Sequence, residues 1–150
     1  LILDLYCGIG TIGLSLSDSA KEVIGVEIVP EAIKDAKENA RINGIHNAKF
    51  FCCDASEIAE KFKNFNESLE AVVIDPPRKG CSSKLIEDVI KMKPKKIAYV
   101  SCNPATLARD LKVFSENSDF KIKKIIPVDM FPRTSHVETI VILSGEIVED

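Results

Sequence analysis

The sequence lacks a long apolar run. No stretch approaches the ~18–20 consecutive apolar residues that a membrane-spanning helix needs. No basic segment followed by an apolar one stands at its start, so no secretion signal is visible. Glycine and proline are scarce, with seven of each in 150 residues, and 29% of the residues are charged, which excludes a disordered or low-complexity chain. With 45% hydrophobic residues, the chain is long enough to form one domain with a core.

The cysteines lack the spacing of a disulfide or zinc framework. There are five of them, an odd number, and no pair forms a CxxC motif. We therefore expect neither disulfides nor a bound metal. Reduced thiols are typical of a cytoplasmic protein, and we expect this protein in the cytoplasm.

An excess of basic residues is also lacking. Twenty Lys and Arg stand against 23 Asp and Glu, which gives a net charge of −3 and a pI of about 5.5. Because nucleic-acid-binding domains are often strongly basic, the charge taken alone argues against one. The first residue is Leu1, and it opens directly within an apolar strand pattern, so we expect this chain to be part of a longer protein.

Strand-like and helix-like segments alternate along the chain. We expect strands at residues 1–6, 23–28, 48–53, 69–74, 97–100, 121–130 and 137–143. We expect helices at residues 12–16, 30–43, 55 to about 62, from Ser82 or Ser83 onward, and from Asn103-Pro104 onward. Only residues 131–136 join the last two strands, too few for a helical crossover, so this pair should be antiparallel. The pattern predicts one α/β domain over residues 1–150, with a mostly parallel sheet, a C-terminal antiparallel strand and the layout of Rossmann-like methyltransferases.

A glycine-rich segment follows the first expected strand. Residues 7–13 contain a GxGxxG pattern that includes Gly8 and Gly10. Such glycines let the backbone approach a pyrophosphate at a helix N-terminus, as in dinucleotide-binding folds. They fit equally well against the methionine part of S-adenosylmethionine, and a tight turn without a ligand also remains open. Glu27, at the end of the second strand, could accept hydrogen bonds from both ribose hydroxyls in either kind of site.

Three further acids separate these interpretations. Asp4 precedes the glycines, Asp54 ends the third strand, and Asp75-Pro76-Pro77-Arg78 ends the fourth. Asp54 is well placed to meet an adenine amino group, and the DPP turn puts rigid backbone at the sheet edge where ligands bind. The alternatives are a helix cap for Asp54 and a plain proline turn after Asp75. Together the acids favour S-adenosylmethionine over a nicotinamide cofactor.

Cys102 and Glu138 are the candidate catalytic residues. Cys102 follows the fifth strand and precedes a helix, where the helix dipole and free N–H groups favour a thiolate. Glu138 begins the last strand, at the same edge if the topology is correct. A thiol nucleophile with a carboxylate base is what methylation of an unactivated pyrimidine C5 requires. The alternatives are a core thiol and an exposed acid at a strand end.

Four segments make the sequence similar to a known family. LDLYCGIGTIGL, VIDPPRKG, YVSCNPATLARDL and DMFPRTSHVETIVIL together resemble the RNA (uracil-5-)-methyltransferases that act on tRNA and 23S ribosomal RNA, over nearly the whole chain. The resemblance implies Cys102 as nucleophile, Glu138 as base and an RNA substrate. It also implies S-adenosylmethionine contacts from these residues: Tyr6, Thr11, Glu27, Asp54 and Asp75.

The resemblance is to the C-terminal catalytic domain of these enzymes. We expect the family's upstream RNA-binding β-barrel and central domain, and any iron–sulfur cluster, to lie outside this chain. That answers the charge objection, since RNA contacts can reside in the upstream part. The chain is expected to be monomeric and away from membranes. Three cations could hold phosphate, although solvated surface is the simpler interpretation: Arg78, Lys79 and Arg109.

Three alternative functions remain. An RNA cytosine-5 methyltransferase would carry a cysteine directly after the prolines, where Arg78 stands here. A non-catalytic S-adenosylmethionine-binding module would not need Cys102 and Glu138. A nicotinamide dehydrogenase would respond to NADH rather than to S-adenosylhomocysteine.

Overall fold

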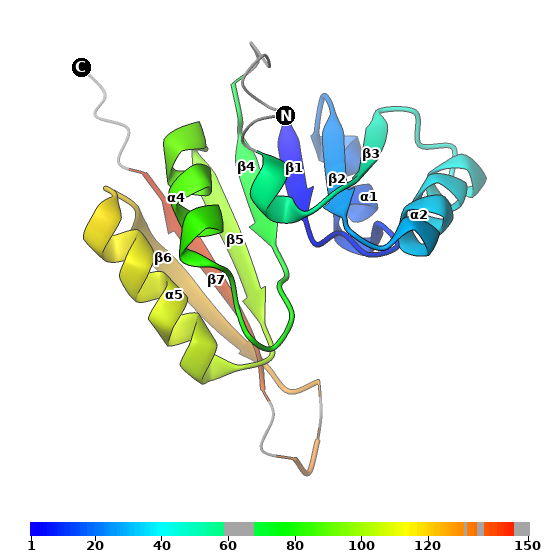
Figure 1. Cartoon of the computed structure of the whole chain (residues 1–150). Helices are drawn as coiled ribbons and strands as arrows, with labels where there is room; N and C mark the ends of the chain where they lie inside the picture. The colour runs from blue at the N-terminus through cyan, green and yellow to red at the C-terminus, as the bar shows by residue number, and fades with distance from the viewer. Residues whose placement is uncertain (59–67, 131, 135–136, 146–150) are drawn as a thin grey trace.

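The described part of the chain forms a single twisted sheet flanked by helices (Figure 1). In the computed structural model, the described residues are 1–58, 68–130, 132–134 and 137–145. Within them seven strands lie side by side in the order β3-β2-β1-β4-β5-β7-β6. Their bounds are Ile2–Leu5 (β1), Val23–Glu27 (β2), Ala48–Cys52 (β3), Ala71–Ile74 (β4), Lys96–Ser101 (β5), Lys121–Val128 (β6) and Glu138–Ser144 (β7).

The strand directions follow from the connections. β1 to β5 pair in parallel, whereas β7 runs antiparallel to both of its neighbours, β5 and β6. The predicted antiparallel closing pair is therefore confirmed. β7 also inserts between β5 and β6, a point that the linker length alone does not reveal.

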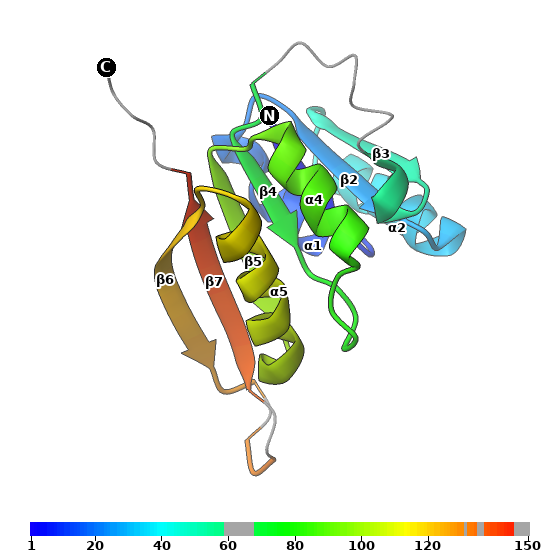
Figure 2. The ribbon, with the colours of Figure 1, turned by 60° about the vertical axis from the view of Figure 1, so that its left-hand side comes forward.

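Helices lie on both faces of the sheet, as the alternating pattern predicts. α1 (Thr11–Ser15) and α2 (Pro30–Ile42) contact β1, β2 and β3 on one face. α4 (Ser83–Met92) and α5 (Pro104–Asn117) lie together along the other face (Figure 2). The main core lies between that face and these two helices, with Leu85, Tyr99 and Phe114 fully buried in it.

α4 and α5 begin where side chains cap them. Ser82 accepts from the Leu85 N–H at 3.2 Å, which decides between the two serines expected at the start of α4. Asn103 caps α5, and Pro104 takes its first turn, where a missing N–H costs nothing. The helix expected from residue 55 begins as a 3-10 turn over Ala55–Glu57 (η2), and Ile58 after it is α-helical; residues 59–62 of that prediction lie outside the described residues. None of the described helices is long and apolar enough to cross a membrane.

We predict that Gly25→Ala destabilises the domain. A Cβ on Gly25 in β2 would lie 2.5 Å from Phe50 Cδ1 and 2.9 Å from Cys7 Sγ, so the packed ring would have to move. Overpacking of this kind costs ~1–3 kcal/mol of unfolding free energy, measurable by chemical denaturation. Gly145→Ala is the matched control, because its nearest atom, Phe120 Cε1, is 3.8 Å away. Equal stability of the two variants would contradict the close packing of β2 against Phe50.

Candidate active site

The predicted site residues meet at one edge of the sheet. Parallel strands present their carboxyl ends at a common edge, and ligands of open α/β sheets bind there. β7 runs the opposite way, so its first residue, Glu138, lies at the same edge as Cys102, which follows β5. The other predicted positions follow the ends of β1, β2, β3 and β4: Tyr6, Gly8, Gly10, Thr11, Glu27, Asp54 and Asp75.

The loop after β1 turns sharply into α1. Tyr6, Gly8 and Gly10 all have positive φ, at 61°, 52° and 85°. Tyr6 is a bulky residue in a region that side chains rarely adopt, so the surrounding structure must hold it there. Burial raises the pKa of Tyr6 well above its usual range, and the phenol keeps its proton. The loop thus presents bare backbone beside a neutral hydroxyl.

Asp4 is bonded to α1, the helix that follows this loop. Its carboxyl group is only 1% exposed, and Oδ2 accepts from the Gly13 N–H at 2.8 Å. Its other oxygen, Oδ1, is buried and has no hydrogen-bond partner in the described structure. Burial raises the pKa of Asp4 to about 7, and the nearby Asp75 carboxylate adds to the rise. A buried acid with one unsatisfied oxygen fits a site for a cationic ligand.

Glu27 accepts hydrogen bonds from two backbone segments, the glycine loop and the turn after β2. Its Oε2 accepts from the Gly8 N–H at 3.2 Å, while Oε1 accepts from the N–H groups of Ile28 at 2.8 Å and Val29 at 3.0 Å. Each carboxylate oxygen can accept more than one hydrogen bond. Glu27 can therefore hold the glycine loop in place and still receive a hydroxyl from a ligand.

Asp54 acts as a cap in this structure. Its Oδ1 accepts from Ser56 N at 2.8 Å and from Ser56 Oγ at 2.7 Å. These bonds, with lesser contributions from Lys79 and Lys84, hold the pKa of Asp54 below its usual range. The capping alternative is thus observed, and the carboxylate stays charged at the expected edge.

The pairing of β5 with β7 sets where Cys102 and Glu138 lie relative to each other. Ser101 pairs with Thr139 in the β5–β7 ladder, and Cys102 and Glu138 are each one residue beyond that pair. Both residues are half-buried. Burial raises the pKa of Asp75, and the Glu138 carboxylate raises it further, so these two acids also lie close together. One edge therefore gathers a thiol, the candidate base and the acid at the end of β4.

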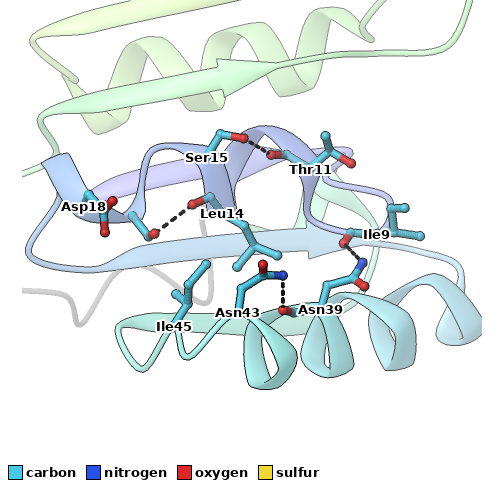
Figure 3. A pocket seen from close by; sticks show the side chains of 9 residues that line it. Ile9, Thr11, Leu14, Ser15, Asp18, Asn39, Asn43 and Ile45 are labelled. Atoms are coloured by element: carbon cyan, nitrogen blue, oxygen red, sulfur yellow. Dashed lines mark hydrogen bonds between the residues drawn. The ribbon is translucent and has the colours of Figure 1, made fainter.

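Thr11 lies at the first turn of α1 and lines a separate hollow. This hollow of about 450 Å³ lies between α1 and α2, and its wall includes Leu14, Asn39 and Asn43 (Figure 3). Asn39 donates to the Ile9 carbonyl at 3.0 Å and so ties α2 to the glycine loop. The residues that line the hollow are mostly neutral and polar.

Sequence reasoning missed the residues that hold the loop after β4. Asp110 in α5 is 1% exposed, and it accepts from the Tyr99 hydroxyl at 2.6 Å and from the Cys81 N–H at 2.8 Å. Arg109, considered above as a phosphate ligand, instead donates to Asp110 and to the backbone of that loop. The signal in the sequence is slight: an acid at position 110 next to the apolar stripe of the helix.

The comparisons with known proteins agree with this geometry. The model of the tRNA (uracil-5-)-methyltransferase family matches residues 1–146. The chain belongs to this family. In Bacillus cereus a protein named as an uncharacterised RNA methyltransferase is 52% identical over 143 residues, which are 95% of this chain and 31% of that protein. A similarly named protein of Oceanobacillus iheyensis is 51% identical over 140 residues, 93% of this chain and 30% of that protein.

A solved structure of the family has the same fold. It is the tRNA (uracil-54, C5)-methyltransferase of Pyrococcus abyssi in complex with S-adenosyl-L-homocysteine, with a TM-score of 0.81 and 37% sequence identity. The match covers 95% of this chain and 33% of that chain. The present chain thus spans about a third of the length of each of these proteins. Its described residues contain no group of three or more His, Cys, Asp or Glu placed to hold a metal ion.

We predict that Asp4→Asn changes how stability depends on pH. The pKa of Asp4 rises from 3.8 to about 7 on folding, so between these values the folded state binds more protons than the unfolded state. The free energy of unfolding therefore falls as pH rises through this window, by ~4 kcal/mol at most, and is constant above it. Asn keeps an oxygen for the Gly13 N–H but does not ionise, so the variant should lack this fall.

Chemical denaturation of both proteins at about pH 5 and about pH 8 measures the difference. Asp4→Asn should gain stability relative to wild type at the higher pH. Parallel changes in the two proteins would show that Asp4 keeps an ordinary pKa.

Proposed function

We propose that the full-length protein transfers a methyl group from S-adenosylmethionine to C5 of a uridine in RNA, with tRNA and ribosomal RNA as the two substrate classes. The β5–β7 register carries this proposal, because it brings Cys102 and Glu138 to the edge that also holds the glycine loop. The tRNA (uracil-5-)-methyltransferase family match supports the same reaction class. The five free thiols fit the reducing cytoplasm, where we expect the protein to act.

The residues present fit S-adenosylmethionine. This cofactor is a nucleoside that carries a cationic sulfonium and an ammonium group. The unsatisfied Oδ1 of Asp4 and the nearby Asp75 suit those positive charges. In this proposal Glu27 accepts hydrogen bonds from the ribose hydroxyls and Asp54 accepts one from the adenine amino group, next to the backbone of Gly8 and Gly10.

Cys102 starts the reaction in this proposal. The target uridine leaves its base stack and enters the site. The Cys102 thiolate adds to C6 of uracil, which forms an S–C6 bond and moves the C5–C6 π electrons into an enolate. S-adenosylmethionine, when bound, supplies an electrophilic methyl group that C5 can accept.

Glu138 completes the reaction. Its carboxylate removes the proton from C5, the freed electron pair restores the C5–C6 double bond, and the S–C6 bond breaks to release Cys102. A base at this position must lie on the same edge as the nucleophile, which the β5–β7 register provides. Partial burial suits the role, since a half-buried carboxylate is less strongly hydrated.

We predict that Glu27→Ala weakens the binding of S-adenosylhomocysteine. Loss of a charged acceptor for two ribose hydroxyls costs ~1.5–3 kcal/mol. Because Glu27 also holds the Gly8 N–H, Glu27→Gln is the milder variant and should have an intermediate effect. Titration calorimetry on both, with the exposed Glu31→Gln as control, measures the change. If Glu27→Ala binds as tightly as wild type, Glu27 is not a cofactor ligand.

We predict that Cys102→Ala and Glu138→Gln stop the reaction of the full-length enzyme at different steps. Cys102→Ala should abolish methyl transfer and any covalent RNA adduct, because C5 is not nucleophilic until C6 is attacked. Glu138→Gln should still permit attack and methyl transfer but slow proton removal by ~10²–10⁴. The methylated base should then remain bonded to Cys102 and migrate with the protein in denaturing electrophoresis.

RNA containing 5-fluorouridine provides an independent check. Wild type should trap this RNA covalently, because fluorine cannot leave as a proton. The exposed Cys52→Ala and Glu116→Gln are matched controls and should turn over normally. An adduct formed by Cys102→Ala would refute the nucleophile, and normal turnover by Glu138→Gln would refute the base. Mapping of 5-methyluridine in RNA from cells that lack the gene identifies the substrate RNA.

A further inference from the structure

The loop between β4 and α4 is bonded to the start of α5. The Arg78 carbonyl accepts from Asn103 Nδ2 at 3.3 Å and from Thr106 Oγ1 at 3.2 Å. Asn103 is the N-cap of α5 and comes directly after Cys102. The turn that carries Arg78 and the segment that carries the thiol are therefore held together by side chains of one helix.

One helical turn farther along, Arg109 holds the next part of the same loop. Its Nη2 donates to the Lys79 carbonyl at 2.8 Å and to the Cys81 carbonyl at 3.2 Å. Its Nε donates to Asp110 Oδ1 at 2.9 Å. A Cβ on Gly80, which has φ +74°, would lie 2.5 Å from Asp110 Oδ2, so the loop backbone lies directly on this pair.

Asp110 also reaches the cofactor side of the site. Its Oδ2 accepts from the Cys81 N–H and from the Tyr99 hydroxyl. Burial raises the pKa of the Cys81 thiol to about 11, so the thiol keeps its proton, and the hydroxyls of Tyr99 and Tyr6 lie near enough to influence that pKa. A continuous set of contacts thus runs from the glycine loop, through Cys81 and Asp110, to Arg109.

We propose that Arg109 and Asp110 are positioning residues that fix the 75–81 loop relative to Cys102. The proposal rests on the function proposed above. Asp75 and Arg78 occupy this loop, and Cys102 precedes the helix that clamps it, so the network sets the space in which the target base meets the thiol. Reaction rates depend steeply on such spacing, and a misplacement of ~1 Å can cost ~10²-fold.

The nature of the contacts favours positioning over simple stability. Residues that only stabilise a core are commonly apolar, whereas this pair joins an Arg109 side chain that is 55% exposed to the buried carboxylate of Asp110. Here the donors of Thr106 and Arg109 converge on backbone carbonyls of a loop, and α4 has its own cap at Ser82. The loop contacts are therefore not needed to start that helix.

The test uses Arg109→Lys and Thr106→Val in the full-length enzyme. Lys keeps the charge but loses the planar fork that reaches two carbonyls, and Val is close in shape to Thr but lacks the hydroxyl. We expect Arg109→Lys to lower kcat and the rate of adduct formation with 5-fluorouridine RNA by on the order of 10- to 100-fold. Thr106→Val should have a smaller effect in the same direction.

Cofactor binding should be spared. The dissociation constant of S-adenosylhomocysteine and the KM for S-adenosylmethionine should change much less than kcat in both variants. Glu27 and the glycines keep their contacts, and the Asp75 N–H is held by the Leu5 carbonyl of β1 at 3.4 Å, independently of Arg109. Lys112→Ala is the matched control on the same helix, since the Lys112 side chain is exposed and its ammonium group pairs with Glu116 at 3.6 Å. It should behave as wild type.

Two outcomes would overturn the proposal, and they differ from each other. If Arg109→Lys lowers only the melting temperature, and kcat and adduct rate are normal where the protein is fully folded, the network is merely structural and the proposed function stands. If wild type itself forms no adduct with 5-fluorouridine RNA, the proposed function falls, and the positioning role falls with it.

Discussion

The antiparallel pairing of β7 with β5 is the constraint on which the candidate site depends. A parallel sheet alone brings the ends of β1 to β5 to one edge, which suffices to gather the glycine loop, Glu27, Asp75 and Cys102. It cannot supply a residue from the start of a strand at that edge. β7 does so because it runs the other way, and its ladder with β5 leaves little freedom in where Glu138 stands relative to Cys102.

Charge and burial act together at this edge. Asp4 and Asp75 both have raised pKa values, chiefly from burial, and each is raised further by another carboxylate: Asp75 acts on Asp4, and Glu138 acts on Asp75. Such an arrangement costs free energy in the empty protein. A bound cation offsets that cost, so the same acids that weaken the fold favour a positively charged ligand. Stability and binding are coupled through these carboxyl groups.

Much of the fold could be predicted from the sequence, because the spacing of apolar residues and the residues that start or end a helix are local signals. Pro30 and Asn103-Pro104 mark helix starts, and the short 131–136 linker predicts an antiparallel pair. The insertion of β7 between β5 and β6 could not be predicted from the linker length, since a short linker allows either β6 or β7 to pair with β5. The helix expected from residue 55 begins as a 3-10 turn, because Asp54 bonds to Ser56 and so stabilises a tighter local turn.

Some residues of the candidate site could likewise be predicted from the sequence, and others could not. Residues that follow strand ends could be assigned from position alone, because every such residue shares the edge. Asp110 could not, since its burial depends on Gly80 and Cys81 crossing over it from a loop 29 residues earlier. Arg109 looks like a solvated cation in the sequence, and its role depends on carbonyl groups that no sequence pattern records.

If the protein acts on RNA as proposed, the acidic balance of the chain limits how that RNA can approach. Two lysine clusters, at residues 91–96 and 121–124, flank the starts of β5 and β6, at the edge opposite Cys102. Near the candidate site, Lys79 and Lys84 already act on Asp54 and lower its pKa. Phosphates placed close to Asp75 and Glu138 would be repelled, whereas a neutral uracil would not. Under the proposed function, the edge thus suits a single base extended away from its phosphate backbone, because the base can enter without bringing phosphates close to these acids.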